Sequence, residues 1–203
     1  MAFFVAPVAL ISAKGGLTHR RWGKVYFWAM VGVAVSAIVL AIHQPNYFLA
    51  CVSVFSFYLA FRGYRALAMK PTTKERGGPK SLDWIGLVLA LIGSTALLVL
   101  GIMQPSRVWV VLGPVAVTFG AVGLFLGLTD LYQFLFPPRD KMNWWYSHMT
   151  GMTASYIAAV TAFSVTNFRF MPVVARWLWP IVIGTPLLAL WVRYYKKKFR
   201  KSA

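Results

Sequence analysis

Acidic side chains are scarce in this chain of 203 residues, which has four aspartates and glutamates in all. So few carboxylates argue against a carboxylate pair that performs general acid–base catalysis. The sequence also contains no phosphate-binding glycine loop with its lysine, and no paired His-Glu metal motif. No hydrolase, kinase or nucleotide-binding signature is therefore visible, and the sequence leaves open whether the chain is an enzyme.

Cysteine and histidine are also rare, with one cysteine and three histidines. A lone Cys51 excludes an intramolecular disulfide and a cysteine-based metal site, and we expect it to be a small buried hydrophobic side chain. A four-helix arrangement with two haems would need four histidine ligands. At most one haem with two histidine ligands is possible here, and no other metal site is predicted.

Apolar residues, by contrast, dominate the chain. Hydrophobic residues make up 59% of it and charged residues 12%, compared with about 25% charged in ordinary soluble domains. The mean hydropathy is +0.65, and the apolar residues fall in runs of about 20, the length that crosses a bilayer. Because backbone amides in lipid must find partners within their own segment, helices are expected. We predict an all-α, polytopic transmembrane bundle forming a single integral membrane domain, with full spans at about 24–42, 46–69, 83–103, 108–135, 143–167 and 176–195.

Residues 2–13 form a seventh, shorter apolar segment that contains Pro7. At about 1.5 Å per residue it reaches roughly 18 Å, which is less than a bilayer core of about 30 Å. No basic residue precedes it and no convincing cleavage site follows it, so a signal peptide is not favoured. We expect a half-span or re-entrant segment, or a truncated first helix.

The formal net charge is +17, and the positions of the basic residues along the chain indicate its topology in the membrane. If six spans alternate, one side of the membrane carries 18 of the 21 basic residues, and the other side carries Arg107, Arg169 and Arg176. The positive-inside rule then predicts a bacterial inner-membrane protein with a cytoplasmic C-terminus. The basic residues are expected to contact anionic lipids of the cytoplasmic leaflet, and no nucleic-acid-binding module is visible. A membrane protein partner or a homo-oligomer is also possible.

Small residues recur on the predicted spans, with Gly113, Gly120 and Gly127 spaced at intervals of seven. Such faces allow two helices to approach closely in lipid. We interpret them as packing surfaces of the bundle.

Ionisable residues within membrane helices are candidate functional residues because they are costly to bury. His19, His148 and Asp130 all fall toward the predicted cytoplasmic side. Two histidines at one depth are able to serve as axial ligands of a b-type haem, with Asp130 orienting one ring from the second shell. The same residues suit a quinone headgroup or proton transfer.

Several alternatives stay open at this point. His19 can be an interfacial residue, and His148 with Asp130 a structural hydrogen-bonded pair. A small-molecule or proton-coupled transporter would need a water-lined cavity that reaches Asp130. A membrane scaffold or assembly protein would have neither a cofactor nor a transport path.

Two segments resemble an uncharacterised bacterial family of predicted membrane proteins, a domain of unknown function. They are the GG-x-x-HRR-x-GK segment at Gly15–Lys24 and the HM-x-x-M-x-x-SYIAAVTAF segment at His148–Phe163. The resemblance implies a multi-span helical fold in the bacterial inner membrane and no established activity. Members look as though they begin with a longer first helix, so this chain is expected to start within that helix. His19 and His148 both lie in the matching segments.

Overall fold

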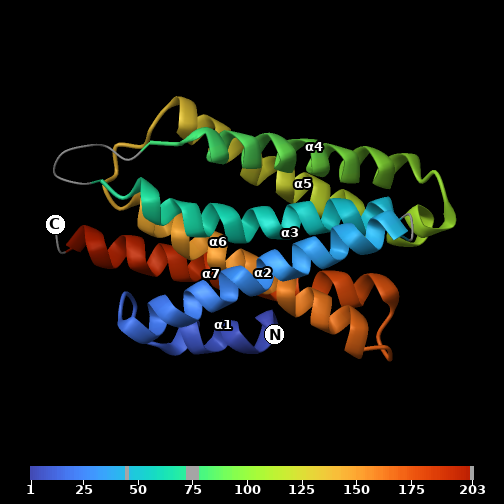
Figure 1. Cartoon of the computed structure of the whole chain (residues 1–203), viewed down its shortest axis with the longest axis horizontal. Helices are drawn as coiled ribbons and strands as arrows, with labels where there is room; N and C mark the ends of the chain where they lie inside the picture. Colours follow the sequence, from blue (N-terminus) through green and yellow to red (C-terminus); the bar gives the residue numbers. More distant parts are fainter. Residues whose placement is uncertain (44–45, 72–77, 202–203) are drawn as a thin grey trace.

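A computed structural model describes residues 1–43, 46–71 and 78–201, with residues 200–201 described by their backbone alone. Every regular element in this part of the chain is helical and none is a strand (Figure 1). The elements are α1 (Ala2–Ile11), α2 (Leu17–His43), α3 (Tyr47–Arg65), the 3-10 helix η1 (Ala66–Met69), α4 (Ser81–Met103), α5 (Arg107–Leu135), α6 (Asn143–Asn167) and α7 (Val173–Lys201). The all-α prediction is confirmed.

Five of these helices are long and apolar enough to cross a membrane, namely α2, α3 with η1, α4, α5 and α7. α6 has 25 residues and is about 37 Å long at 1.5 Å per residue, but serines, threonines and His148 make it more polar than the others. Large apolar side chains such as Trp28, Ile85 and Phe125 are exposed on the outside of the bundle, as is typical of a lipid-facing surface. A sixth span at α6 stays a prediction.

The short N-terminal segment is a ten-residue helix, α1, that packs against α2 and α6. Ala2, Val5 and Ala6 are buried in this contact, and the ring of Phe3 stacks on Phe163 with centroids 4.2 Å apart. At about 1.5 Å per residue α1 spans about 15 Å, roughly half a bilayer core. The prediction of a short apolar segment is confirmed.

Local sequence explains where several helices begin and end. The side chain of Asn46 accepts a hydrogen bond from the Leu49 amide and caps the start of α3. The carboxylate of Asp83, in the first turn of α4, accepts from the Lys80 amide at 2.8 Å. Gln104 ends α4 in the left-handed conformation, with a φ of 47°, and Pro105 follows it. A proline cannot continue the hydrogen-bonding pattern of the helix.

α4 and α5 pack closely against each other along their length. A Cβ atom at Gly120 would lie 2.6 Å from the Leu98 backbone nitrogen, and one at Gly127 would lie 2.7 Å from the Leu91 side chain. A Cβ atom at Gly113 would meet the Gly101 carbonyl at 3.0 Å. The predicted packing role of this glycine stripe is confirmed.

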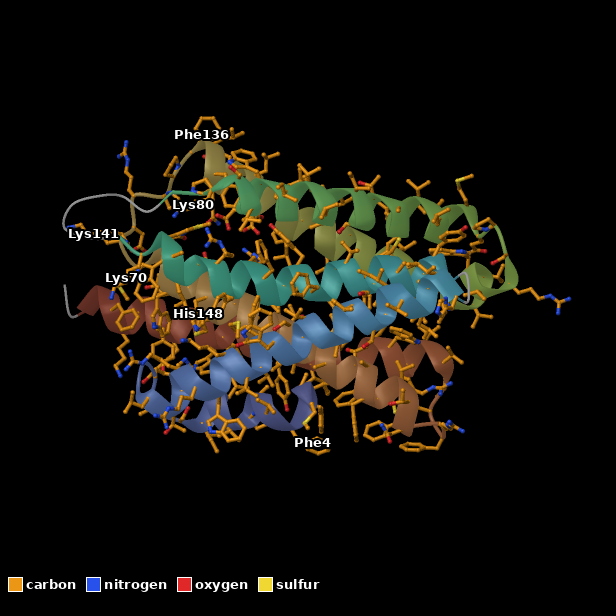
Figure 2. The ribbon with its side chains drawn as sticks, viewed as in Figure 1. Phe4, Lys70, Lys80, Phe136, Lys141 and His148 are labelled. Atoms are coloured by element: carbon orange, nitrogen blue, oxygen red, sulfur yellow. The ribbon has the colours of Figure 1, made fainter. Side chains whose placement is uncertain are left out.

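The helices alternate in direction, so that their connections gather at two ends of the molecule (Figure 1). One end holds the α1–α2 turn, η1, the α5–α6 connection and the end of α7, and we call it the basic end. Figure 2 shows Lys70, Lys80 and Lys141 at this end and His148 further into the bundle. The opposite end holds the α4–α5 and α6–α7 connections (Figure 1), and Arg107, Arg169 and Arg176 lie in or next to these connections in the sequence. The basic residues Lys74 and Arg76, predicted for the basic end, lie outside the described residues.

Candidate functional site

His19 and His148 lie side by side, although 129 positions separate them in the sequence. The centroids of their imidazole rings are 6.2 Å apart and the ring planes are nearly perpendicular, at 79°. His19 comes from the first turn of α2 and His148 from the second turn of α6. The structure thus brings together the two histidines that the sequence singled out.

Each ring is held by a backbone carbonyl through its Nδ1 atom. His148 Nδ1 is 2.8 Å from the Gly63 oxygen, and His19 Nδ1 is 2.9 Å from the Ala9 oxygen. A carbonyl oxygen only accepts, so each Nδ1 must carry the hydrogen and donate it. In a neutral imidazole this leaves Nε2 with a free lone pair, the arrangement found in most metal-ligating histidines.

A close crossing of α3 and α6 positions His148. Gly63 and Gly151 meet there backbone to backbone, and a Cβ atom at Gly151 would lie 2.6 Å from the Gly63 nitrogen. His148 is three residues before Gly151, so it faces the same side of α6 and reaches the Gly63 carbonyl. His19 is positioned by the turn between α1 and α2, where Gly15 has a φ of 80°, a conformation that glycine adopts at little cost.

The two histidines line a cavity of about 450 Å³ near the basic end of the bundle. We call it the histidine cavity. Its walls are mainly aromatic and apolar, with a few cationic groups, and its volume is within the range of small-molecule sites, about 300–1,000 Å³. The other residues that line it include Lys14, Arg20, Lys24, Tyr64, Trp144, Trp145, Met149, Met152, Trp191 and Tyr195.

The histidine cavity has a positive electrostatic character. Lys14, Arg20 and Lys24 line it, and no aspartate or glutamate does so within the described part of the chain. The Lys14 ammonium lies 5.7 Å above the Trp191 ring and donates to the Leu10 carbonyl. Partial desolvation lowers the pKa of Lys14 below its ordinary value. A ligand with anionic or acceptor oxygen atoms suits this cavity best.

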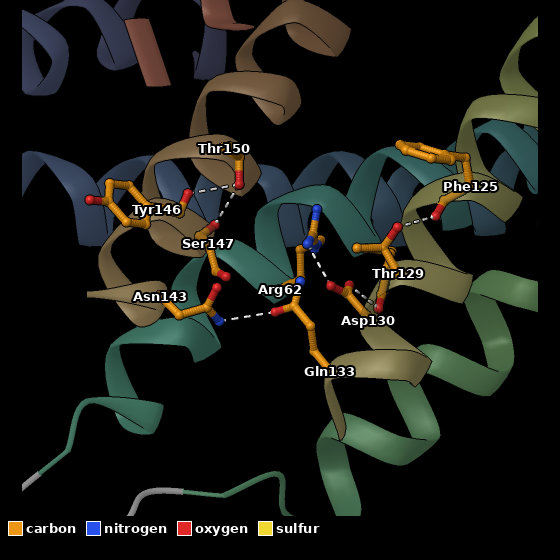
Figure 3. Close-up of polar contacts among 10 residues, drawn as sticks. Arg62, Phe125, Thr129, Asp130, Gln133, Asn143, Tyr146, Ser147 and Thr150 are labelled. Carbon is orange, nitrogen blue, oxygen red and sulfur yellow. Dashed lines mark hydrogen bonds and ion pairs between the residues drawn. The ribbon is translucent and has the colours of Figure 1, made fainter. Parts of the chain in front are cut away.

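Asp130, the third predicted site residue, does not join the histidines. Its Oδ2 accepts from the Tyr58 hydroxyl at 2.6 Å, and its Oδ1 accepts from Arg62 Nη2 at 2.5 Å (Figure 3). Asp130 and Arg62 thus form a buried ion pair between α5 and α3, and Tyr58 engages the second carboxylate oxygen. The expected contact from Asp130 to a histidine ring is absent from the described contacts, and the rings are oriented instead by the carbonyls of Gly63 and Ala9.

Sequence reasoning missed the partners of both acidic residues on the helices. Arg65 Nε and Nη2 each donate to Asp83 at 2.7 Å in a two-pronged pair. The signal that was available is the presence of Arg62 and Arg65 at the end of an apolar span, where a buried guanidinium needs a carboxylate partner.

The third histidine, His43, lies exposed at the far end of α2. Among the described residues no group of three or more histidine, cysteine, aspartate or glutamate side chains is placed to hold a metal ion.

Comparisons with protein-family models, curated proteins and solved structures found no match to this chain. The resemblance to the uncharacterised bacterial family therefore stays a prediction, and the function has to be argued from the site itself.

Proposed function

We propose that this chain is a six-span protein of the bacterial inner membrane, with its basic end and C-terminus in the cytoplasm. Five apolar helices of sufficient length support the membrane location. The length of α6 and its packing between α3 and α7 support its role as the sixth span. The 18-to-3 division of basic residues supports the orientation, because short cytoplasmic loops are enriched in lysine and arginine.

We infer further that the histidine cavity binds a planar redox cofactor, haem b or a quinone. This inference rests on a hydrogen-bonding arrangement that the two imidazoles share. Both Nδ1 atoms are held by carbonyls, the rings lie 6.2 Å apart, and both line one positively charged cavity. An Nε2 lone pair on each ring is the group that would bind a metal ion or accept a hydrogen bond from a ligand.

Haem b fits these residues in three respects. His19 and His148 would hold the haem iron, each through the Nε2 atom that its Nδ1 hydrogen bond leaves available. Lys14, Arg20 and Lys24 are available to pair with the two propionate groups of a haem, and Trp144, Trp145 and Trp191 offer apolar walls. A bound haem would supply one-electron transfer, and the two histidines would set its potential as axial ligands.

A quinone fits the same cavity less completely. A neutral imidazole with its hydrogen on Nδ1 is an acceptor at Nε2, so it receives a hydrogen bond from the hydroxyl of a reduced quinol. The carbonyl oxygens of the oxidised ring need donors, and Lys14 and Arg20 would have to provide them. Haem b is therefore our first choice and a quinone the second.

The test is the ligand content of the full chain, purified in detergent from bacterial membranes. We expect the absorption bands of a b-type haem or, failing these, a quinone in the organic extract. Protein that carries neither, after expression with sufficient haem supply, contradicts the proposal. A membrane partner that co-purifies with such ligand-free protein would instead favour the scaffold or assembly role.

A transport function is the second candidate, because a cavity does reach Asp130. This cavity has a volume of about 400 Å³ and lies on a different face of α3 from the histidines. Both oxygens of Asp130 are engaged in the present arrangement, so a solute or proton would have to displace Tyr58 or Arg62. Flux into vesicles that is lost in Asp130→Asn but kept in Asp140→Asn would support this role.

A further inference from the structure

The cavity beside Asp130 is separate from the histidine cavity, and we call it the Arg62 cavity. It is bounded by α3 with η1, by the end of α5 and the loop that follows, and by the start of α6. Arg62 lines it, whereas Tyr64, two residues further on and about 200° around the helix, lines the histidine cavity. Trp144 lines both cavities. Arg62, Arg139 and Lys141 line the Arg62 cavity and not the histidine cavity, so substitutions at these positions test the Arg62 cavity separately.

Several hydrogen-bond donors inside the Arg62 cavity are available to a ligand. Arg62 has five N–H groups and uses one nitrogen, Nη2, to hold Asp130. The side-chain oxygen of Gln133 accepts from Asn143 at 3.0 Å, which leaves the Gln133 amide hydrogens for another partner (Figure 3). Ser147 adds a hydroxyl to the same wall. Since both Asp130 oxygens are already engaged, a ligand that brings acceptor oxygens fits this set of donors.

The charges that line the cavity leave one unbalanced positive charge. Among the described lining residues, the basic ones are Arg62, Arg65, Arg139 and Lys141, and the acidic ones are Asp83, Asp130 and Asp140. Arg62 pairs with Asp130 and Arg65 with Asp83 in the interior. Arg139 and Lys141 lie exposed in the loop between α5 and α6, so the surplus is at the mouth of the cavity. A ligand with one negative charge balances this arrangement.

Apolar side chains form the rest of the wall, among them Phe61, Met69, Phe134 and Trp144. A free inorganic anion would leave these groups without a partner, whereas acyl chains would cover them. The cavity also lies at the basic end of the bundle, where Figure 2 shows Lys70, Lys80 and Lys141. This is the level at which we expect headgroups to meet the protein.

From these observations we propose that the Arg62 cavity binds the phosphodiester headgroup of an anionic phospholipid. The phosphodiester carries one negative charge and accepts hydrogen bonds from the free N–H groups of Arg62 and from Gln133. Arg139 and Lys141 hold the same group from the cytoplasmic mouth, and the acyl chains lie along the apolar wall. Zwitterionic headgroups add a cation to a mouth that is already positive, so they bind more weakly.

Native mass spectrometry of the full chain in a neutral detergent tests this proposal. The protein is titrated with phosphatidylglycerol, with phosphatidylcholine of the same acyl chains, and with inorganic phosphate. We expect retention of one phosphatidylglycerol in preference to phosphatidylcholine, without displacement by inorganic phosphate. Equal retention of the two lipids contradicts the headgroup assignment, and displacement by inorganic phosphate contradicts a lipid as the ligand.

Substitutions locate the bound lipid. Arg139→Gln with Lys141→Gln removes two exposed cations without touching the buried pairs, and we expect about a fivefold loss of lipid affinity for each charge. Arg62→Lys keeps the charge and removes the planar fork, and is expected to weaken binding further. Arg107→Gln removes one exposed cation at the opposite end of the bundle and serves as the matched control. If Arg107→Gln weakens binding as much as either loop substitution, the lipid binds by general surface charge and the proposal fails.

Discussion

Gly63 and Gly151 touch backbone to backbone where α3 crosses α6, and a Cβ atom at Gly63 would lie 2.6 Å from the Met152 nitrogen. The carbonyl of the same Gly63 receives the hydrogen bond from His148. The separation of the two helices and the position of the imidazole therefore depend on one crossing point. In lipid, where the hydrophobic effect does not press helices together, such small-residue contacts make close approach possible.

Substitution of Gly151 by alanine is expected to push α6 away from α3. Overpacking of this kind costs about 1–3 kcal/mol, and the same displacement lengthens the His148–Gly63 hydrogen bond. Both the thermal unfolding temperature in detergent and the amount of bound cofactor should fall. Gly32→Ala is the control, because a Cβ atom at Gly32 meets nothing within 4 Å. A Gly151→Ala protein as stable as Gly32→Ala would show that the crossing is not tight.

Removal of the charge of Asp130 should destabilise the bundle strongly. Asp130→Asn leaves the Arg62 guanidinium in a buried position without its carboxylate partner, a loss that costs about 3–5 kcal/mol in other proteins. The double change Asp130→Leu with Arg62→Met removes both charges and is expected to recover much of the loss. Chemical denaturation in detergent measures both effects. Asp140→Asn, at an exposed position, should change stability by less than about 0.5 kcal/mol. If the single Asp130→Asn variant matches this control, the ion pair does not stabilise the protein.

The orientation of the chain makes a separate prediction. A reporter fused after Ala203 should be active in the cytoplasm, and a reporter inserted between Gln104 and Arg107 should be active on the opposite side. Both follow from the concentration of basic residues at one end of the bundle. A C-terminal reporter active only in the periplasm would contradict the proposed topology. Two reporters on the same side would contradict the proposal that α5, α6 and α7, which lie between the two reporters, all span the membrane.

The sequence predicted most of the fold because hydrocarbon-length apolar runs have few alternatives. The helices α3 with η1, α4 and α5 fall close to the residues expected from their apolar runs, whereas α2 begins well before its expected start at residue 24. The stripe of Gly113, Gly120 and Gly127 packs as its spacing indicated. α6 is the exception, because its serines, threonines and His148 lower its apolar character while its length still suits a span.

The site was predicted only in part. His19 and His148 were identified because a titratable ring within a membrane helix is costly, and the structure places them together. Their hydrogen-bond partners are the backbone carbonyls of Ala9 and Gly63. Every residue has a backbone carbonyl, so the residue types alone do not indicate which carbonyl a histidine contacts. These two hydrogen bonds are set by how α1 and α3 pack in the bundle. Asp130 was assigned to the histidines because helical spacing on a single span does not say which neighbouring helix it faces.

The measurement closest to the central claim is the cofactor content of the three single histidine variants, each purified as the full chain in detergent. We predict that His19→Ala and His148→Ala each lose the haem absorption or the extracted quinone. His43→Ala, at the exposed far end of α2, should keep the ligand at the level of the unchanged protein. If the unchanged protein carries a cofactor that all three variants retain equally, the ligand binds elsewhere and the histidine cavity is not its site.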